Sequence, residues 1–193
     1  MSEDTWVWKL GGSLLELTDF PQRLETALSR SSHRPVFVIG GGPIADEVRR
    51  WDQRFGIGEK NSHDLALRAM ELNERLVTTV WPRAVLVADR PAAENAWRTD
   101  RVPVLQTRTF LETEEPRNAS ETSPVPSLPH TWDATSDTIA AWITLRLRAE
   151  GLMLVKSIDR PESGVADAVD SAFPYFVERI PNLGWINLRT IDS

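Results

Sequence analysis

The sequence of 193 residues contains no cysteine and only three histidines. Disulfide bonds and thiolate metal sites are therefore excluded, and three scattered histidines do not form a metal site, so we assign no metal-binding residues. No window approaches the roughly 20 apolar residues of a membrane-spanning helix, and the acidic start of the chain lacks the apolar core of a signal peptide. We therefore expect a cytoplasmic protein with no membrane partner.

Basic residues are also scarce. The chain has 22 lysine and arginine residues against 28 acidic ones, which gives a formal net charge of -6. Proteins that bind nucleic acid usually carry a basic patch, and this composition does not favour one. We therefore expect no nucleic-acid partner and favour chemistry on a small molecule, carried out by a single domain that spans residues 1–193.

Short apolar runs rich in β-branched residues alternate with helical patterns along the chain. This alternation is typical of α/β proteins, in which helices cover both faces of a parallel sheet. We predict a three-layer α/β/α sandwich with a central, mainly parallel sheet. The predicted strands are 6–10, 35–40, 84–88, 102–106, 152–158 and 184–191. The predicted helices are 20–31, 43–55, 63–77, 135–151 and 167–180, with Thr135 or Ser136 as the cap of the fourth.

One segment breaks this pattern. Residues 111–130 contain four glutamates and four prolines without apolar periodicity, so we predict a loop that is longer than an ordinary connection. A solvated acidic linker and a mobile lid over a site are equal alternatives for it.

Two glycine clusters follow predicted strands. The first strand ends in Lys9-Leu-Gly-Gly-Ser13, and the second runs into Gly40-Gly-Gly-Pro-Ile-Ala-Asp46. In an open α/β sheet ligands collect at the carboxyl ends of the strands, where glycine amides and helix N-termini bind phosphate. Neither cluster matches a P-loop or a dinucleotide fingerprint, and each by itself is more often only a tight turn.

Lys9 strengthens the phosphate interpretation. A lysine at the end of a buried strand loses hydration unless it meets an anion, and beside glycine amides a phosphate group is the natural partner. Two glycine clusters of this kind suggest two anionic groups, one at each cluster.

The ordered motifs resemble the amino acid kinase family. They are KLGGSLL at 9–15, VIGGGPIADEVR at 38–49, TSDTIAAW at 135–142 and LVKSID at 154–159, and the resemblance covers roughly residues 6–170. Two further stretches, SHDLALRAMELN at 62–73 and WDATSDTIAAWI at 132–143, together with the short length, are similar to one branch of that family. This branch is the kinase of methanofuran biosynthesis, which phosphorylates (5-(aminomethyl)furan-3-yl)methyl phosphate for one-carbon metabolism.

The resemblance implies phosphoryl transfer from ATP, with Mg²⁺ on the ATP oxygens, to a small-molecule phosphorylated acceptor. The implied catalytic residues are Lys9, Asp137 and Lys156. Gly11, Gly12 and Ser13 would bind the ATP phosphates, and Gly40, Gly41, Gly42, His63 and Asp133 the acceptor. Asp137 would organise the lysines rather than act as a base. The family also implies a homodimer or a higher homo-oligomer.

Each assignment has a structural alternative. Asp137 would also favour a helix N-terminus, and Lys156 would also pair with Asp159. Asp133 would also serve as a cap, and His63 as a cap on the surface. The pair Asp159-Arg160 stands where many members of the family have Asp-Gly, which indicates an altered adenine side.

Two alternatives for the function stay open. The same scaffold would also suit a carboxylate or a nucleoside monophosphate as acceptor. A binding or regulatory relative that turns nothing over would keep the same phosphate-binding loops.

Overall fold

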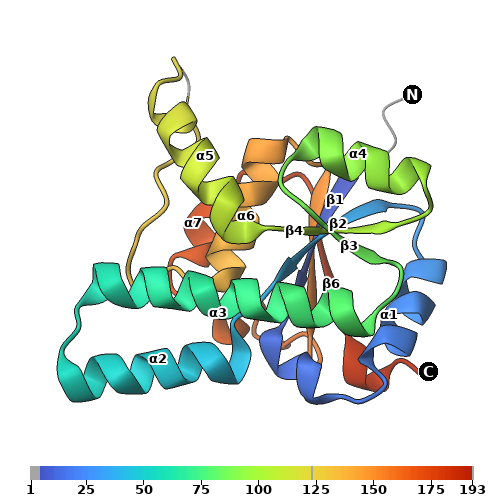
Figure 1. The fold of residues 1–193 in the computed structure, drawn as a ribbon, viewed down its shortest axis with the longest axis horizontal. Coiled ribbons are helices and arrows are strands. Elements are labelled where there is room, and N and C mark those ends of the chain that lie inside the picture. The colour runs from blue at the N-terminus through green and yellow to red at the C-terminus, as the bar shows by residue number, and fades with distance from the viewer. Residues whose placement is uncertain (1–4, 123, 193) are drawn as a thin grey trace.

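The computed structural model describes residues 5–122 and 124–192. Six parallel strands form one sheet in the order β3-β4-β2-β1-β5-β6 (Figure 1). The strands are β1 (Thr5–Leu10), β2 (Arg34–Ile39), β3 (Ala84–Val87), β4 (Val102–Leu105), β5 (Gly151–Lys156) and β6 (Leu183–Asn187). The predicted α/β class with a parallel central sheet is confirmed.

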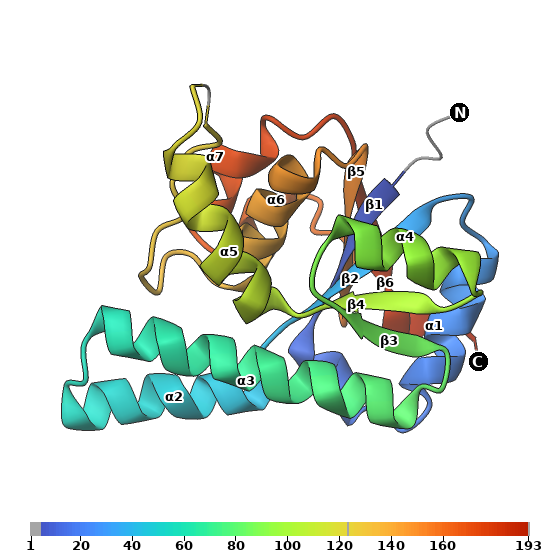
Figure 2. The ribbon, with the colours of Figure 1, turned by 45° about the horizontal axis from the view of Figure 1, so that its top comes forward.

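Helices cover both faces of the sheet (Figures 1 and 2). They are α1 (Phe20–Ser29), α2 (Gly42–Phe55), α3 (Glu59–Val80), α4 (Arg90–Arg98), α5 (Thr107–Ala119), α6 (Ser136–Leu147) and α7 (Phe173–Val177). Short 3₁₀ helices lie at η1 (Gly12–Glu16), η2 (Val165–Ala168) and η3 (Leu188–Thr190). Within the described residues, no helix combines the length and the apolar character needed to cross a membrane.

Side chains of β1 divide the core into its two halves. Trp6, Trp8 and Leu10 join a cluster with α1, η1 and η3, whereas Val7 joins a second cluster with α4, α5, α6 and α7. The division follows from the strand itself, because successive side chains point to opposite faces of a sheet. Lys9 shares the face of Val7, so its side chain points toward the layer that contains α6.

The strand order positions the site. The chain runs from β1 to β2 on one side and returns later to place β5 on the other side of β1. Ligands of open α/β sheets bind at such a reversal, beyond the carboxyl ends of the strands. The loops that follow β1, β2 and β5 therefore meet at one edge of the sheet.

The loop predicted for 111–130 is wrong in its first part, because α5 runs through to Ala119 and contains Pro116. Packing overrides the local sequence: Phe110 and Leu111 are buried in the core. Asn118 exchanges two hydrogen bonds with the backbone of Val125, at 2.7 and 2.8 Å. Of this segment, residue 123 lies outside the described residues, and the predicted mobility stays a prediction.

Other elements also differ from the predictions: the predicted helix 135–151 ends at Leu147, the predicted strand 184–191 ends at Asn187 before η3, and α4 was not predicted. Helix α3 begins at Glu59 rather than at residue 63 and ends at Val80. The predicted helix 167–180 is wrong as a single element: η2 and α7 lie there, with Asp170 between them in non-helical backbone. Proline at the second position of α7 suits a helix start, which explains why the helix begins only at Phe173.

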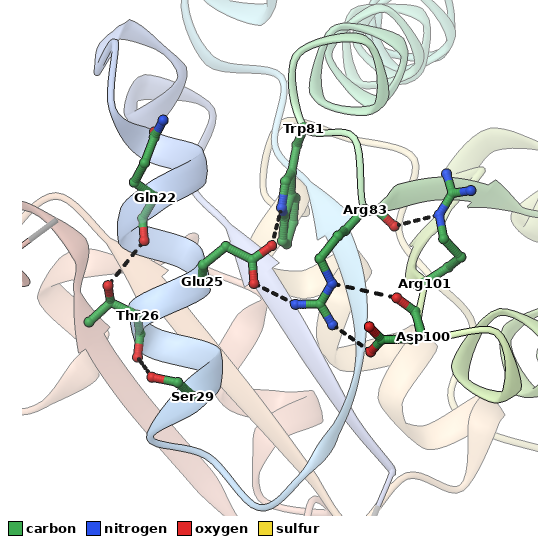
Figure 3. A network of polar contacts seen from close by, with 8 residues as sticks. All are labelled: Gln22, Glu25, Thr26, Ser29, Trp81, Arg83, Asp100 and Arg101. Atoms are coloured by element: carbon green, nitrogen blue, oxygen red, sulfur yellow. Dashed lines mark hydrogen bonds and ion pairs between the residues drawn. The ribbon is translucent and has the colours of Figure 1, made fainter.

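A polar network closes the opposite edge of the sheet, where β3 and β4 begin (Figure 3). Glu25 of α1 accepts a hydrogen bond from the indole of Trp81 at 2.7 Å and pairs with the guanidinium of Arg83. Arg83 also pairs with Asp100 at 2.9 Å, and Arg101 donates to the Arg83 carbonyl at 3.0 Å. The network ties α1 to the turns that precede two strands.

Candidate active site

Two lysines share the carboxylate of one aspartate, at the side of the sheet where the strands have their carboxyl ends. The Nζ atom of Lys9 lies 2.9 Å from Oδ1 of Asp137, and that of Lys156 lies 2.7 Å from Oδ2. Lys156 also donates to the carbonyl of Ala168 at 2.9 Å. All three side chains are at most 13% exposed, so the two positive charges lie close together with a single negative charge between them.

The strand register brings the two lysines together. In the β1–β5 ladder Lys9 is opposite Leu154, and Lys156 lies two residues further along β5. Because side chains alternate between faces along a strand, both lysines project from the same face. Asp137 lies in the first turn of α6, which packs on that face and closes the triad.

Burial and the neighbouring charges shift the pKa values of Asp137 and Lys156. Burial opposes ionisation of Asp137, but the charges of Lys9 and Lys156 outweigh it and hold the pKa of this carboxyl below its ordinary value. Burial, together with repulsion from Lys9, lowers the pKa of Lys156 to about 8. At neutral pH the cluster therefore carries a net positive charge, which is the charge that a phosphate group requires.

Asp170 holds the start of α6 and was not among the residues that the sequence indicated. Its carboxylate accepts hydrogen bonds from the Thr135 amide at 2.9 Å, the Thr135 hydroxyl at 2.7 Å and the Thr138 amide at 3.1 Å. Thr135 occupies the N-cap position, as predicted, but its own side chain makes no capping hydrogen bond to the helix. The cap comes from a residue far along the chain, which local capping patterns do not reveal.

The two glycine clusters pack directly against each other. A Cβ atom on Gly12 would lie 2.6 Å from the Gly40 oxygen and closer still to the Gly42 nitrogen. A Cβ atom on Gly42 would lie 2.7 Å from the Gly12 carbonyl carbon, and Gly42 has a φ of 53°, which favours glycine. The backbones of the two loops can approach this closely only because both positions lack a side chain.

Not every glycine amide is available to a ligand. The Gly11 amide donates to the Val155 carbonyl at 2.9 Å and the Gly40 amide to the Leu10 carbonyl at 2.8 Å, so both continue the sheet. The Gly11 amide is therefore engaged in the sheet, although Gly11 lines the cavity, and its role in binding ATP stays a prediction. Among the described residues, the amides of Gly12, Gly41 and Gly42 have no hydrogen-bond acceptor.

A cavity of about 390 Å³ joins these groups. It reaches the three residues of the triad and both glycine loops, which is the size and character of a small-molecule site. Of the residues indicated by the sequence, its lining includes Lys9, Gly11, Gly12, Ser13, Gly41, Gly42, His63, Asp137 and Lys156. Gly40 and Asp133 are not in the lining.

His63 is buried rather than a cap on the surface. It lies in the second turn of α3, is 9% exposed and stacks on His130 with ring centroids 4.4 Å apart. Burial, together with the neighbouring His130, lowers the pKa of His63 to about 4, so the ring is neutral at pH 7. Its Nε2 atom is buried and has no hydrogen-bond partner among the described residues.

Asp133 does not line the cavity. Its carboxylate accepts a hydrogen bond from the Ser171 hydroxyl at 2.8 Å, and its carbonyl accepts one from the Ala172 amide at 2.9 Å. These contacts join the turn before α6 to the turn before α7. The Asp133 carboxylate therefore makes a structural contact but does not cap α6 or α7, and its predicted role in binding the acceptor stays a prediction.

Arg49 is a cavity residue that the sequence did not single out. Its guanidinium lies 4.6 Å from the centroid of the Trp132 ring and 3.1 Å from the Asp46 carboxylate, and all three residues line the cavity. The Trp132 indole donates to Asp52 at 2.9 Å, which fixes the ring beneath the arginine. The only signal in the sequence is that Arg49 lies two helical turns beyond the glycines, on α2.

The donor set of the cavity does not suit a metal ion held by the protein. Among the described residues, no group of three histidine, aspartate or glutamate side chains is arranged to hold one. The Asp137 carboxylate already lies between two ammonium groups. A magnesium ion in this cavity would therefore take its ligands mainly from phosphate oxygens and water.

Fold and site together define an α/β protein with a cavity that is lined by two lysines and two glycine loops. The sequence model of the amino acid kinase family matches residues 4–190, and the chain belongs to this family. A comparison with curated protein sequences finds no match.

Solved structures with a similar fold include several uridylate kinases. The enzyme from Archaeoglobus fulgidus is 20% identical, with a TM-score of 0.58 over 94% of this chain and 89% of that chain. The UMP kinase from Ureaplasma parvum is 11% identical, with a TM-score of 0.65 over 98% and 92%. The UMP kinase from Bacillus anthracis is 10% identical, with a TM-score of 0.61 over 96% and 88%. Family and fold both support a small-molecule kinase.

Proposed function

We propose that the protein transfers the γ-phosphoryl group of ATP to a small phosphorylated acceptor. The observation that carries this proposal is the pair Lys9 and Lys156, held by Asp137 in the cavity between two glycine loops. Phosphoryl transfer needs positioning and charge stabilisation more than covalent chemistry, and this arrangement offers both.

The transfer breaks the bond between the γ-phosphorus and the bridging oxygen of ATP. An oxygen of the acceptor phosphate forms the new bond, so that ADP leaves and the acceptor becomes a diphosphate. Lys9 and Lys156 stabilise the negative charge on the phosphoryl oxygens during the transfer. Gly12 and Ser13 donate to the phosphates of ATP.

Asp137 positions the two lysines in this scheme. Its lowered pKa keeps the carboxylate ionised, and both of its oxygens already face an ammonium group. An acceptor phosphate is an anion at neutral pH and needs no general base. Because Asp137 lies in the first turn of α6, it holds the lysines in a fixed place while the phosphoryl group moves.

Arg49 and the glycine loop after β2 support a phosphorylated acceptor. A guanidinium group and free glycine amides are the groups that bind phosphate oxygens most readily. His63 lines the same cavity, and its unpaired Nε2 atom would bind a polar group of the acceptor. The stretches SHDLALRAMELN and WDATSDTIAAWI favour (5-(aminomethyl)furan-3-yl)methyl phosphate, the acceptor in methanofuran biosynthesis.

A nucleoside monophosphate is the second candidate acceptor. The observation in its favour is that the structures with this fold described above are uridylate kinases by name. Magnesium would accompany ATP in either reaction, bound by the phosphate oxygens. The homo-oligomer and the cytoplasmic location expected from the sequence stay predictions.

Incubation with Mg-ATP and a panel of acceptors tests the proposal. The panel contains the aminomethylfuran phosphate, UMP and acetylglutamate, and the measurement is ADP release together with mass detection of the product. We expect a diphosphate rather than an acid-labile acyl phosphate. The matched control is Lys60→Ala, since Lys60 is the only other lysine and lies on the exposed start of α3.

Two outcomes would contradict the proposal. Turnover that survives Lys9→Ala as well as it survives Lys60→Ala would remove Lys9 from the mechanism. ATP binding without turnover of any acceptor would favour a binding or regulatory protein on the same scaffold.

A further inference from the structure

One buried amide side chain contacts the glycine loop after β2. Asn73 lies in the middle of α3 and is only 4% exposed. Its Nδ2 atom donates to the Gly40 carbonyl at 2.7 Å and to the Gly41 carbonyl at 2.9 Å. A single side chain therefore contacts two consecutive peptide groups of this loop, and the Gly41 carbonyl also accepts a hydrogen bond from the Ala45 amide at 3.3 Å.

Fixing the carbonyls also fixes the amides. In a trans peptide the C=O and the N–H of the same plane point in opposite directions, and no cis peptide occurs among the described residues. The Gly40 carbonyl shares its plane with the Gly41 amide, and the Gly41 carbonyl shares its plane with the Gly42 amide. Asn73 therefore turns the amides of Gly41 and Gly42 away from α3.

The backbone angles of these two glycines form a known anion-binding shape. Gly41 has right-handed angles, with φ -71° and ψ -25°, and Gly42 has a positive φ of 53°. A right-handed residue followed by a left-handed one directs successive amides toward one point and makes a concave site, or nest, for an anion. Both glycines line the cavity, and their amides have no acceptor among the described residues.

The nest is also coupled to the other loop. Gly42 packs against Gly12, so a change in the Gly41–Gly42 backbone would alter the contact between the two loops. Asn73 is the polar side chain that holds this backbone from the rear. It lies outside the cavity lining, so it acts on a ligand only through the loop.

We propose that Asn73 is a positioning residue that holds the Gly41–Gly42 nest in its anion-binding form, with a phosphate group as the ligand. That this phosphate belongs to the acceptor rests on the proposed function. The binding of a phosphate group by the nest does not rest on the proposed function, because it is argued from the backbone geometry of Gly41 and Gly42.

Inorganic phosphate is the probe that tests the inference without turnover. In a titration followed by ¹⁵N nuclear magnetic resonance, we expect the Gly41 and Gly42 amides of the wild type to shift and saturate. Asn73→Asp keeps the size of the side chain but cannot donate to two carbonyls, and we expect at least tenfold weaker binding. The matched control is Asn61→Asp: Asn61 also lies on α3 and donates to a carbonyl, that of Ile57 at 2.8 Å, but is exposed. This control should bind phosphate like the wild type.

Three results would overturn the inference. The first is unchanged phosphate affinity in folded Asn73→Asp, which would leave Asn73 a purely structural amide. The second is a wild type in which phosphate does not shift the Gly41 and Gly42 amides. The third result applies if the variant does not fold, and it is measured on the wild type. Rapid hydrogen exchange of the Asn73 side-chain amide protons would show that the two hydrogen bonds do not hold the loop.

The test separates this inference from the proposed function. Phosphate binding that depends on Asn73 without turnover of any acceptor would keep the nest and remove the kinase. Turnover that is insensitive to Asn73→Asp, with unchanged KM for the acceptor, would keep the kinase and remove the positioning role.

Discussion

The Lys9–Asp137–Lys156 triad and the Glu25–Arg83–Asp100 network lie at opposite edges of the same sheet. Each joins basic and acidic side chains from elements far apart in the sequence. The triad is at most 13% exposed and faces a cavity. In the network the exposed fraction runs from 35% for Glu25 to 90% for Asp100.

Because they differ in burial, the exposed network and the buried triad have different roles. Water screens the exposed network, so its ion pairs contribute little and serve mainly to hold α1 against the turns before β3 and β4. Burial of the triad removes that screening, and two ammonium groups held by one carboxylate leave a positive charge without a partner. An anion supplied by a ligand would pair with this positive charge. We therefore place the chemistry at the edge of the sheet that holds the triad.

The largest expected effect comes from removing one charge of the triad. Lys9→Ala should lower kcat by about 10³-fold, the loss typical of removing a charge-stabilising donor from an active site. Steady-state kinetics with Mg-ATP and the preferred acceptor measure it. Arg83→Ala makes the same kind of change at the other edge and should leave kcat unaltered. An equal loss of kcat in the two variants would show that the triad has no special role in catalysis.

The second effect is the pH dependence of Lys156. Its pKa is about 8 in the folded protein against an ordinary 10.5, so its charge is lost as the pH rises through 8. We expect kcat/KM to fall about tenfold per pH unit above that value. Arginine stays charged, so Lys156→Arg should move the fall to higher pH, and the pH profiles of the two proteins give the answer.

The same lysine makes an opposite prediction for stability. Between pH 8 and 10.5 the unfolded chain binds the extra proton, so the free energy of unfolding gains a rising contribution from Lys156 across that window. Urea unfolding at several pH values gives the free energy of unfolding of the wild type and of Lys156→Arg, and the slopes of this free energy against pH are compared. A wild-type slope no steeper than that of Lys156→Arg would show that burial does not penalise this charge.

A third, smaller effect concerns Glu74, a buried acid on α3. It accepts a hydrogen bond from the Thr107 amide at 3.0 Å, and burial raises its pKa to about 7 from 4.5. Because the native state holds the proton more tightly, its contribution to stability is present below pH 4.5 and is lost as the pH rises through 7. Glu74→Gln keeps an acceptor for Thr107 and should be more stable than the wild type at pH 8 by about 2 kcal/mol. Urea unfolding at pH 5 and pH 8 checks it, and a difference of the same size at both values would exclude titration of Glu74 as the cause.

The smallest effect is expected at the exposed edge. Arg83→Ala should lower the free energy of unfolding by about 1 kcal/mol or less, since its partners Glu25 and Asp100 are 35% and 90% exposed. Addition of salt should reduce the loss further. A loss of several kcal/mol that persists in high salt would mean that this network is as important to the fold as the buried triad.

The sequence predicted a large part of the fold. Apolar runs of β-branched residues mark most of the strands, because a strand buried on both faces leaves a continuous apolar signature. Helix α5 escaped prediction, since its surface is acidic and contains Pro116. What makes it a helix is burial of Phe110 and Leu111 and the contact of Glu74 with Thr107. Such contacts are long-range, and local propensity does not contain them.

The site was predicted unevenly for a related reason. Lys9 and the glycines are visible because a charge or a pair of glycines at the end of a buried strand is locally conspicuous. Arg49, Asn73 and Asp170 are ordinary polar residues in their own segments, and only their partners give them a role. Asp133 shows the converse, because a residue inside a family-like motif turned out to contact Ser171 instead of the cavity.

By itself the sequence determined the α/β class, the two glycine loops and the lysines that follow from their strands. Local pattern suffices for these features, because strand periodicity and the absence of a Cβ atom act within a few residues. The tertiary structure alone decided that Asp137 lies between Lys9 and Lys156, that Asp170 caps α6 and that Asn73 holds Gly40 and Gly41. These pairings join residues about 20 to 130 positions apart, and their energies depend on burial that exists only once the chain has folded.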